Sequence, residues 1–167
     1  NPYQDNGIKI FGPGGDKLAD DEEVAIERWL DAGDDAYPEI TGDAIGDADR
    51  YRRQEGAYRD FLLANAPYLD GMRVGLDCAN GAASDLAPEV YRRIGARTQV
   101  IHAEPDGRNI NVACGSTHPD AIREHVLGND LEVGVTFDGD ADRALLVDRR
   151  GRIVTGDHVL AIVARVR

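Results

Sequence analysis

The sequence predicts an α/β fold: a mixed, mainly parallel sheet with flanking helices. Three observations support this fold class. Short apolar runs alternate with helix-like segments from residue 71 onward. The chain is 42% hydrophobic and 30% charged, which is typical of globular domains. Its 167 residues are also enough for one well-buried core, at about 150 residues per domain.

The first 65 residues predict two helices and little sheet. A short strand between two turns is expected in the glycine-rich opening, residues 1–19. Residues 20–33 place apolar side chains at helical spacing behind four acids, which suit the positive end of a helix dipole. Residues 34–47, rich in Asp and Gly, indicate a loop, and residues 48–65 indicate a second helix.

The part of the chain after residue 71 predicts alternating strands and helices. Apolar runs indicate strands at residues 72–77, 98–102, 132–137 and 144–147, and a turn at residues 149–151 leads into Ile153 and Val154. Two helices fall between them: Leu86–Ile94, with Pro88 in its first turn, and Pro119–Leu127, which Gly128 stops. This alternation is typical of parallel strands joined by right-handed crossovers. A last apolar stretch, Val159–Val166, looks helical.

Composition narrows the classes of partner. Lys and Arg number 19 and Asp and Glu 31, so the formal net charge is −12. Such an acidic surface disfavours nucleic acids and anionic membranes, and no apolar run approaches the roughly 18 residues of a membrane span. Two cysteines, Cys78 and Cys114, make no disulfide framework, so we expect a reducing cytoplasm and a buried Cys78.

The sharpest motif is a run of alternating carboxylates. Asp138, Asp140 and Asp142 follow one apolar strand and precede another. Three like charges in one tight loop favour a cation among them, and carboxylate oxygens favour Mg²⁺ or Ca²⁺. A solvated acidic turn is the alternative, and an EF-hand is excluded because Arg143 and Arg149 occupy its sixth and twelfth positions. Arg143 suggests a phosphate in the same site, or else an ion pair with one of the acids.

Two other segments carry weaker signals. Gly7 allows a tight turn before Lys9, which could carry a proton or clamp a phosphate, or could be an ordinary surface lysine. Residues 104–119 indicate a polar loop that ends in a helix cap. Its His118-Pro119 pair is more typical of a helix start than of a catalytic base.

Taken together, these motifs resemble a known family. The Asp138–Arg143 loop resembles the metal-binding loop of the α-D-phosphohexomutases, and residues 1–9 resemble the tail of their active-site motif. Residues 77–82, 104–111 and 114–119 resemble the bacterial phosphoglucosamine mutases most closely within that family. The resemblance covers nearly the whole chain, with its motifs in the family's order.

The resemblance implies a phosphoryl-transfer enzyme. Family members of this kind convert glucosamine 6-phosphate to glucosamine 1-phosphate in the cytoplasm, through a phosphoserine and a bisphosphate, toward UDP-N-acetylglucosamine. Arg143 matches the arginine of the phosphoryl site, Lys9 the lysine of proton transfer and phosphoryl contact, and Asn1 the asparagine after the nucleophile's histidine. The resemblance also implies that Mg²⁺ is held by Asp138, Asp140 and Asp142.

The resemblance also implies that the chain is a piece of a longer enzyme. Residues 1–50 match the later part of the family's first domain, 51–155 its second domain, and 156–167 the start of its third. The nucleophilic serine would lie two residues before Asn1, and the loops that select the sugar and clamp its phosphate belong to the third and fourth domains. We therefore expect the chain alone to be inactive. Its expected partners are a small phosphosugar and those two domains, and a homo-oligomer stays open.

Other functions fit parts of the sequence. A phosphomannomutase or phosphoglucomutase of the same family differs in the sugar, whose selecting loop lies elsewhere. A phosphatase with an aspartate nucleophile would use Asp138 and Asp140, but such enzymes usually have Thr or Val where Asp142 stands. A non-catalytic Mg²⁺-binding module is the third alternative.

Overall fold

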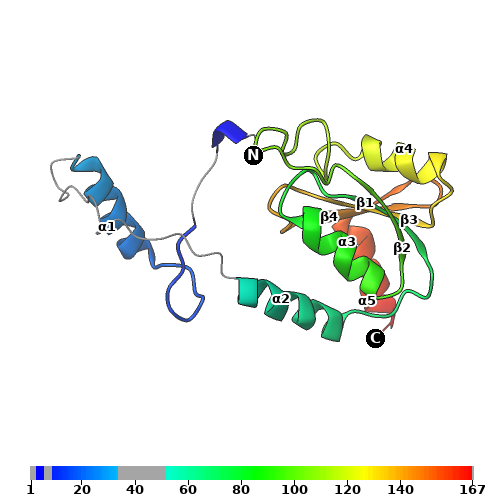
Figure 1. The fold of residues 1–167 in the computed structure, drawn as a ribbon, viewed down its shortest axis with the longest axis horizontal. Coiled ribbons are helices and arrows are strands. Elements are labelled where there is room, and N and C mark those ends of the chain that lie inside the picture. Colours follow the sequence, from blue (N-terminus) through cyan, green and yellow to red (C-terminus); the bar gives the residue numbers. More distant parts are fainter. Residues whose placement is uncertain (1–2, 6–8, 34–51, 167) are drawn as a thin grey trace. The chain divides into compact units, whose positions relative to one another are not determined.

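A computed structural model of the chain describes residues 3–5, 9–33 and 52–166. These residues fall into two compact units (Figure 1). The smaller unit is Gly7–Tyr51, and the larger combines Asn1–Asn6 with Arg52–Arg167. The expected division at residues 50 and 155 into parts of three domains stays a prediction.

The smaller unit contains the predicted helix but not the predicted strand. Helix α1 spans Asp20–Asp31 and has four acids in its first turn, as the dipole argument requires. Within residues 9–19 there is no strand, only one antiparallel bridge between Phe11 and Lys17. The chain turns directly after Phe11, where the N–H of Gly12 donates to the carbonyl of Asp16. The pairing therefore does not extend into a ladder. The predicted loop at 34–47 lies outside the described residues.

The larger unit is built on a mixed sheet, as predicted, and this sheet has five strands. Its strands stand in the order β2-β1-β3-β4-β5. β2, β1 and β3 pair in parallel, whereas β3, β4 and β5 pair in antiparallel fashion. The sheet therefore has as many antiparallel pairings as parallel ones, because the loop from β3 to β4 is too short for a crossover. The strand bounds are β1 Arg73–Asp77, β2 Arg97–Ile101, β3 Val133–Phe137, β4 Ala144–Asp148 and β5 Ile153–Val154.

Four helices accompany this sheet, at α2 Arg52–Asn65, α3 Ala83–Arg93, α4 Asp120–Gly128 and α5 Gly156–Val166. Helix α3 begins three residues before its predicted start, so Pro88 lies inside the helix and not in its first turn. The start was missed because Ala83 and Ser84, although buried, are too small to give an apolar signal. Helix α4 begins at Asp120, one residue after its predicted start, and it ends at Gly128, which was expected to lie just beyond it.

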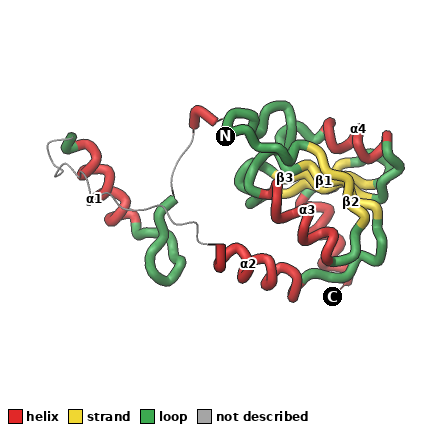
Figure 2. The backbone as a smooth tube through the Cα atoms, in the orientation of Figure 1, coloured by secondary structure: helices red, strands yellow, loops and turns green. Residues whose placement is uncertain are grey.

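The sheet lies between α3 and α4 (Figure 2). On one face, Val74, Leu76 and Val135 pack with Ala83 of α3 and with Cys78, which is fully buried as predicted. On the other face, Ile122, Val126 and Leu131 form a second cluster with Val147 of β4. Gly75 and Gly134 lie under α4, where their missing side chains let the helix approach the strands.

Helix α5 carries an exposed apolar surface. Leu160, Ile162 and Val163 are each at least half exposed, and none of the helix's described residues is buried. The helix is nevertheless short, and no helix in the described ranges has the length and apolar character needed to cross a membrane.

The close approach of α4 to β3 yields a stability prediction. A Cβ at residue 134 would lie 2.7 Å from Val126 and 2.8 Å from Ile122, both of which are buried. Gly134→Ala should therefore lower the free energy of unfolding by about 1–3 kcal/mol in urea denaturation. Gly128→Ala, at the end of the same helix with nothing within 4 Å of its Cβ, should raise that energy or leave it unchanged. Equal effects of the two substitutions would contradict this packing.

The buried cysteine yields a pH prediction. Burial, reinforced by the negative charge of Asp77, raises the pKa of the Cys78 thiol from 9.0 to about 12. The unfolded chain therefore releases this proton at lower pH than the folded one does. The corresponding stability is fully present below about pH 9 and is lost as the pH rises toward 12. Urea denaturation at pH 8 and pH 10.5 measures the loss.

The control for this prediction is Cys78→Ala, which lacks the thiol. Tyr91, whose pKa burial also raises, is present in both proteins, so their difference isolates Cys78. The decline between the two pH values should be smaller in Cys78→Ala. An equal decline in both proteins would show that this thiol does not titrate as described.

Candidate functional site

Three loops meet at one edge of the sheet. Because β1, β2 and β3 run parallel, their carboxyl ends lie at the same edge. Residues 78–82 follow β1, residues 102–119 follow β2, and residues 138–143 follow β3. The motifs found in the sequence after residue 76 are therefore neighbours in space, as is usual for binding sites of α/β proteins.

A buried carboxylate holds these loops together. Asp77, the last residue of β1, is fully buried. Its Oδ1 accepts a hydrogen bond from the backbone N–H of Ala79 at 3.0 Å and contacts Nδ1 of His102 at 3.1 Å. Its Oδ2 accepts from the backbone N–H of Gly115 at 2.9 Å. One side chain thus fixes the starts of the first two loops and the end of the second.

Backbone hydrogen bonds extend these connections to the third loop. The N–H of Ala82 donates to the carbonyl of Gly139 at 2.8 Å, and the N–H of Ser116 donates to the carbonyl of Phe137 at 2.8 Å. Asn80 links the first two loops, since its N–H donates to His102 O at 2.7 Å. The loop that begins at Asp138 is therefore held from both sides.

Two glycines allow this close contact. A Cβ at Gly81 would collide with the backbone of Gly139. A Cβ at Gly115 would lie 2.6 Å from that of Ala79 and 2.7 Å from the carbonyl oxygen of Phe137. Gly115 also has a φ of +75°, a conformation that disfavours other residues. Both positions need the absence of a side chain.

The acidic loop is anchored at its first residue. Asp138 is 5% exposed, and its Oδ1 accepts from the backbone N–H of Arg143 at 3.1 Å. Its Oδ2 accepts from Nε of Arg143 at 3.1 Å and lies 3.0 Å from Nη2. Ala141 turns the chain at a φ of +58°, and its N–H donates to the carbonyl of Asp138 at 3.0 Å. The loop closes on itself through a charged pair.

Asp138 carries a firmly held negative charge. Burial by itself would raise the pKa of its carboxyl, but the backbone N–H and the guanidinium of Arg143 outweigh burial and hold that pKa below 3.8. The carboxylate is therefore ionised at neutral pH. Asp140 and Asp142, by contrast, are exposed. The loop combines one fixed charge with two accessible ones.

Arg143 shows that the loop accommodates a positive charge. Its guanidinium lies 3.0 Å from Oδ2 of Asp138 and 3.5 Å from Oδ1 of Asp142, so it bridges two of the three predicted metal ligands. This is the ion pair that the sequence left open for Arg143. The side chain is 77% exposed and can leave without disturbing a packed core. The carboxylates it would expose are hard oxygen donors, which fit Mg²⁺.

The convergence of the three aspartates stays a prediction. In the described part of the chain, one group of three residues has metal-type donor atoms within 4.8 Å of one another. That group contains none of the three aspartates. Lys9 is exposed and belongs to the smaller unit, whereas Arg143 belongs to the larger one, so a joint role also stays a prediction. Asn1 lies outside the described residues. His118 contacts Thr117 at 3.1 Å and precedes α4, in line with a helix start.

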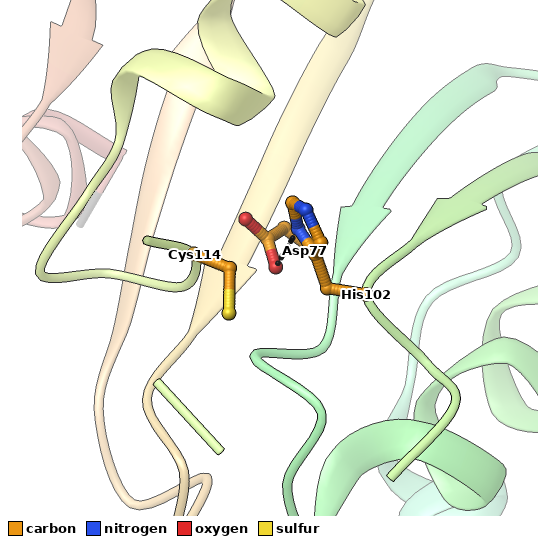
Figure 3. Close-up of side chains that lie close together, drawn as sticks. All are labelled: Asp77, His102 and Cys114. Carbon is orange, nitrogen blue, oxygen red and sulfur yellow. Dashed lines mark hydrogen bonds and ion pairs between the residues drawn. The ribbon is translucent and has the colours of Figure 1, made fainter. Parts of the chain in front are cut away.

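The different group is Asp77, His102 and Cys114 (Figure 3). Sequence reasoning missed it because Asp77 ends β1, whereas His102 and Cys114 lie in the loop after β2, where His102 comes 25 residues after Asp77. No short spacing motif contains them. The one available signal was topological: Asp77 and His102 stand at the carboxyl ends of two strands that were predicted to be parallel.

Comparisons with known proteins agree with this architecture. Residues 57–151 match the family model for phosphoglucomutase/phosphomannomutase, alpha/beta/alpha domain II. A solved structure of a phosphoglucomutase/phosphomannomutase family protein from Burkholderia thailandensis superposes with a TM-score of 0.58 at 25% identity, covering 65% of this chain and 24% of that one.

Curated relatives match over a longer stretch. The chain is 51% identical over all its 167 residues to a phosphoglucosamine mutase of Deinococcus radiodurans, covering 37% of that protein. It is 48% identical over 164 residues to one of Thermus thermophilus, covering 98% of this chain and 36% of that protein. The chain thus spans little more than one third of the length of these relatives. Since the family model matches more than half of it, the chain belongs to the phosphoglucomutase/phosphomannomutase family and contains that family's alpha/beta/alpha domain II.

Proposed function

We propose that this chain is part of a phosphoglucosamine mutase, which interconverts glucosamine 6-phosphate and glucosamine 1-phosphate. The observation that carries the proposal is the Asp138–Arg143 loop, where three carboxylates and one arginine stand at the carboxyl edge of the sheet. The identity of about one half to relatives of that name supports this choice of sugar.

The carboxylates of the loop serve as the ligands of Mg²⁺ in this proposal. Asp138 supplies a fixed, ionised oxygen, and Asp140 and Asp142 are accessible enough to turn toward the same ion. The ion, when bound, neutralises charge on the phosphoryl group that is transferred. The backbone hydrogen bond from Ala82 to Gly139 keeps the loop in place, while the exposed side chains of Asp140 and Asp142 can change orientation.

Arg143 and Lys9 serve the phosphoryl group itself. Arg143 offers a planar fork of donors, which suits phosphate oxygens once the guanidinium leaves the carboxylates. Lys9 carries the proton that moves as a sugar hydroxyl attacks or leaves. The nucleophile in this proposal is a phosphoserine two residues before Asn1 in the complete enzyme, and Asn1 belongs to the same motif.

The complete reaction needs parts that this chain does not contain. The phosphoserine gives its phosphoryl group to the sugar, and the bisphosphate turns over and returns the other group. Sugar selection belongs to later domains, so the chain alone is inactive in this proposal. The enzyme works in the cytoplasm, in amino-sugar metabolism.

A second candidate is a phosphomannomutase or phosphoglucomutase. The family model and the superposed structure both carry those names, and the selecting loop lies outside the chain. Assay of the complete enzyme with glucosamine, mannose and glucose 6-phosphates separates the candidates. The proposal expects the highest kcat/KM with glucosamine 6-phosphate, and a preference for either other sugar would contradict it.

The metal proposal predicts a loss of affinity in Asp140→Asn. Removing one carboxylate charge from the ligand set should weaken Mg²⁺ binding at least tenfold, as measured by calorimetry on the 167-residue chain. Asp85→Asn makes the same charge change at an exposed position of α3 and should leave binding as in the parent chain. If the two variants bind Mg²⁺ equally well, Asp140 is not a ligand.

The phosphoryl-transfer proposal predicts different defects for two cations. In the complete enzyme, Lys9→Ala should lower kcat at least 100-fold with little change in Mg²⁺ affinity, because a proton carrier acts in the chemical step. Arg143→Ala should raise KM as well, because a phosphate contact is lost. Lys17→Ala, an exposed lysine of the same unit that pairs with Glu23, should keep normal kcat/KM. If Lys9→Ala keeps normal kcat/KM, Lys9 has no catalytic role and is an ordinary surface lysine.

A further inference from the structure

A second metal-type cluster contains no residue of the acidic loop. Oxygen, nitrogen and sulfur atoms of Asp77, His102 and Cys114 all lie within 4.8 Å of one another. Figure 3 shows the carboxylate of Asp77 between the other two side chains, with its contact to the His102 ring dashed. We propose that these three residues bind one divalent cation of the zinc class.

The donor set selects the ion. Imidazole and thiolate ligands suit borderline and soft cations such as Zn²⁺ and Cd²⁺, whereas Mg²⁺ prefers oxygen. In a tetrahedral zinc site with bonds of about 2.0–2.3 Å, ligand atoms stand about 3.3–3.8 Å apart. The donors already lie within 4.8 Å of one another and would close to that spacing when the ion binds.

The hydrogen bonds of Asp77 leave room for an ion. An ionised carboxylate has about four acceptor positions. Oδ1 is used by Ala79 N–H and by His102, and Oδ2 by Gly115 N–H. One position on Oδ2 is therefore available, and coordination through it preserves both backbone hydrogen bonds. His102 exchanges its contact with Asp77 for the ion.

The surroundings of the cluster contain polar atoms without hydrogen bonds. Oγ1 of Thr136 is fully buried and has no partner. Thr136 pairs in register with Asp77, so both side chains face the α4 side of the sheet. Nε2 of His125, on α4 above Gly75, is also buried without a partner. Buried polar atoms are normally satisfied, and these two indicate a polar interior able to hold an ion and its water.

The site also needs a path by which the ion enters and a destination for the thiol proton that binding releases. Asp77 and Cys114 are fully buried, but the His102 side chain is 34% exposed and forms the outer wall, open to a solvent ligand. Burial, followed by the charge of Asp77, raises the pKa of the Cys114 thiol, so the sulfur enters as S–H. Coordination breaks this bond, the electron pair forms the S–metal bond, and the proton goes to buffer.

Cd²⁺ titration of the 167-residue chain tests the proposal, because a Cd²⁺–thiolate bond absorbs in the ultraviolet. We expect one equivalent of Cd²⁺ to produce the thiolate band, with about one proton released. Cys114→Ala should lose the band, and Cys78→Ala, which removes the other buried cysteine, should keep it. Excess Mg²⁺ should not displace the ion. No band in the parent chain, or a band lost only in Cys78→Ala, overturns the proposal.

His102→Gln decides the test even if Cys114→Ala does not fold. His102 is partly exposed, so this substitution leaves the core intact. We expect its Cd²⁺ affinity to fall at least tenfold. Asp140→Asn is the matched control in the acidic loop and should leave the band and the affinity unchanged. Unchanged affinity in His102→Gln, or loss in Asp140→Asn, would place the ion elsewhere and refute the site.

Discussion

The carboxylate of Asp77 is the constraint on which the carboxyl edge of the sheet depends. It receives two backbone N–H groups from separate loops and contacts His102 at the end of β2. A buried donor left unpaired costs about 1–3 kcal/mol, so removing the Asp77 side chain would leave both N–H groups without an acceptor and weaken the contact between these loops. The acidic loop then rests on them through Gly139 and Phe137. Its position is thus set in part by backbone contacts with the two neighbouring loops.

The acidic loop has a rigid part and a part that can change position. Asp138 is buried and fixed by the backbone of Arg143, whereas the guanidinium of Arg143 is mostly exposed. Coulomb attraction holds this guanidinium against Asp138 and Asp142, where a divalent cation would compete with it. One arginine therefore balances part of the negative charge of the loop.

The sequence predicted most of the sheet and helices of the larger unit, because apolar runs there alternate with polar or glycine-containing segments. Strand β3, for example, was expected at residues 132–137 and spans Val133–Phe137. The start of α3 was missed because its first residues are small, and the opening strand was wrong because Phe11 has a single bridge partner. In the candidate site, residues 138–143 were found by their spacing. The hydrogen bonds of Asp77 were not, because tertiary contacts between distant loops leave no local pattern.

The contact between Gly81 and Gly139 also limits how this protein can diverge over evolutionary time. A larger residue at Gly81 would push on the backbone of the neighbouring loop, so it would be accepted only with a compensating change there. The two loops must therefore change together or stay as they are. Gly128, at the end of α4, is under no such limit, because a side chain there would meet nothing within 4 Å. The position of the acidic loop thus depends on the close contact of two glycines, Gly81 and Gly139.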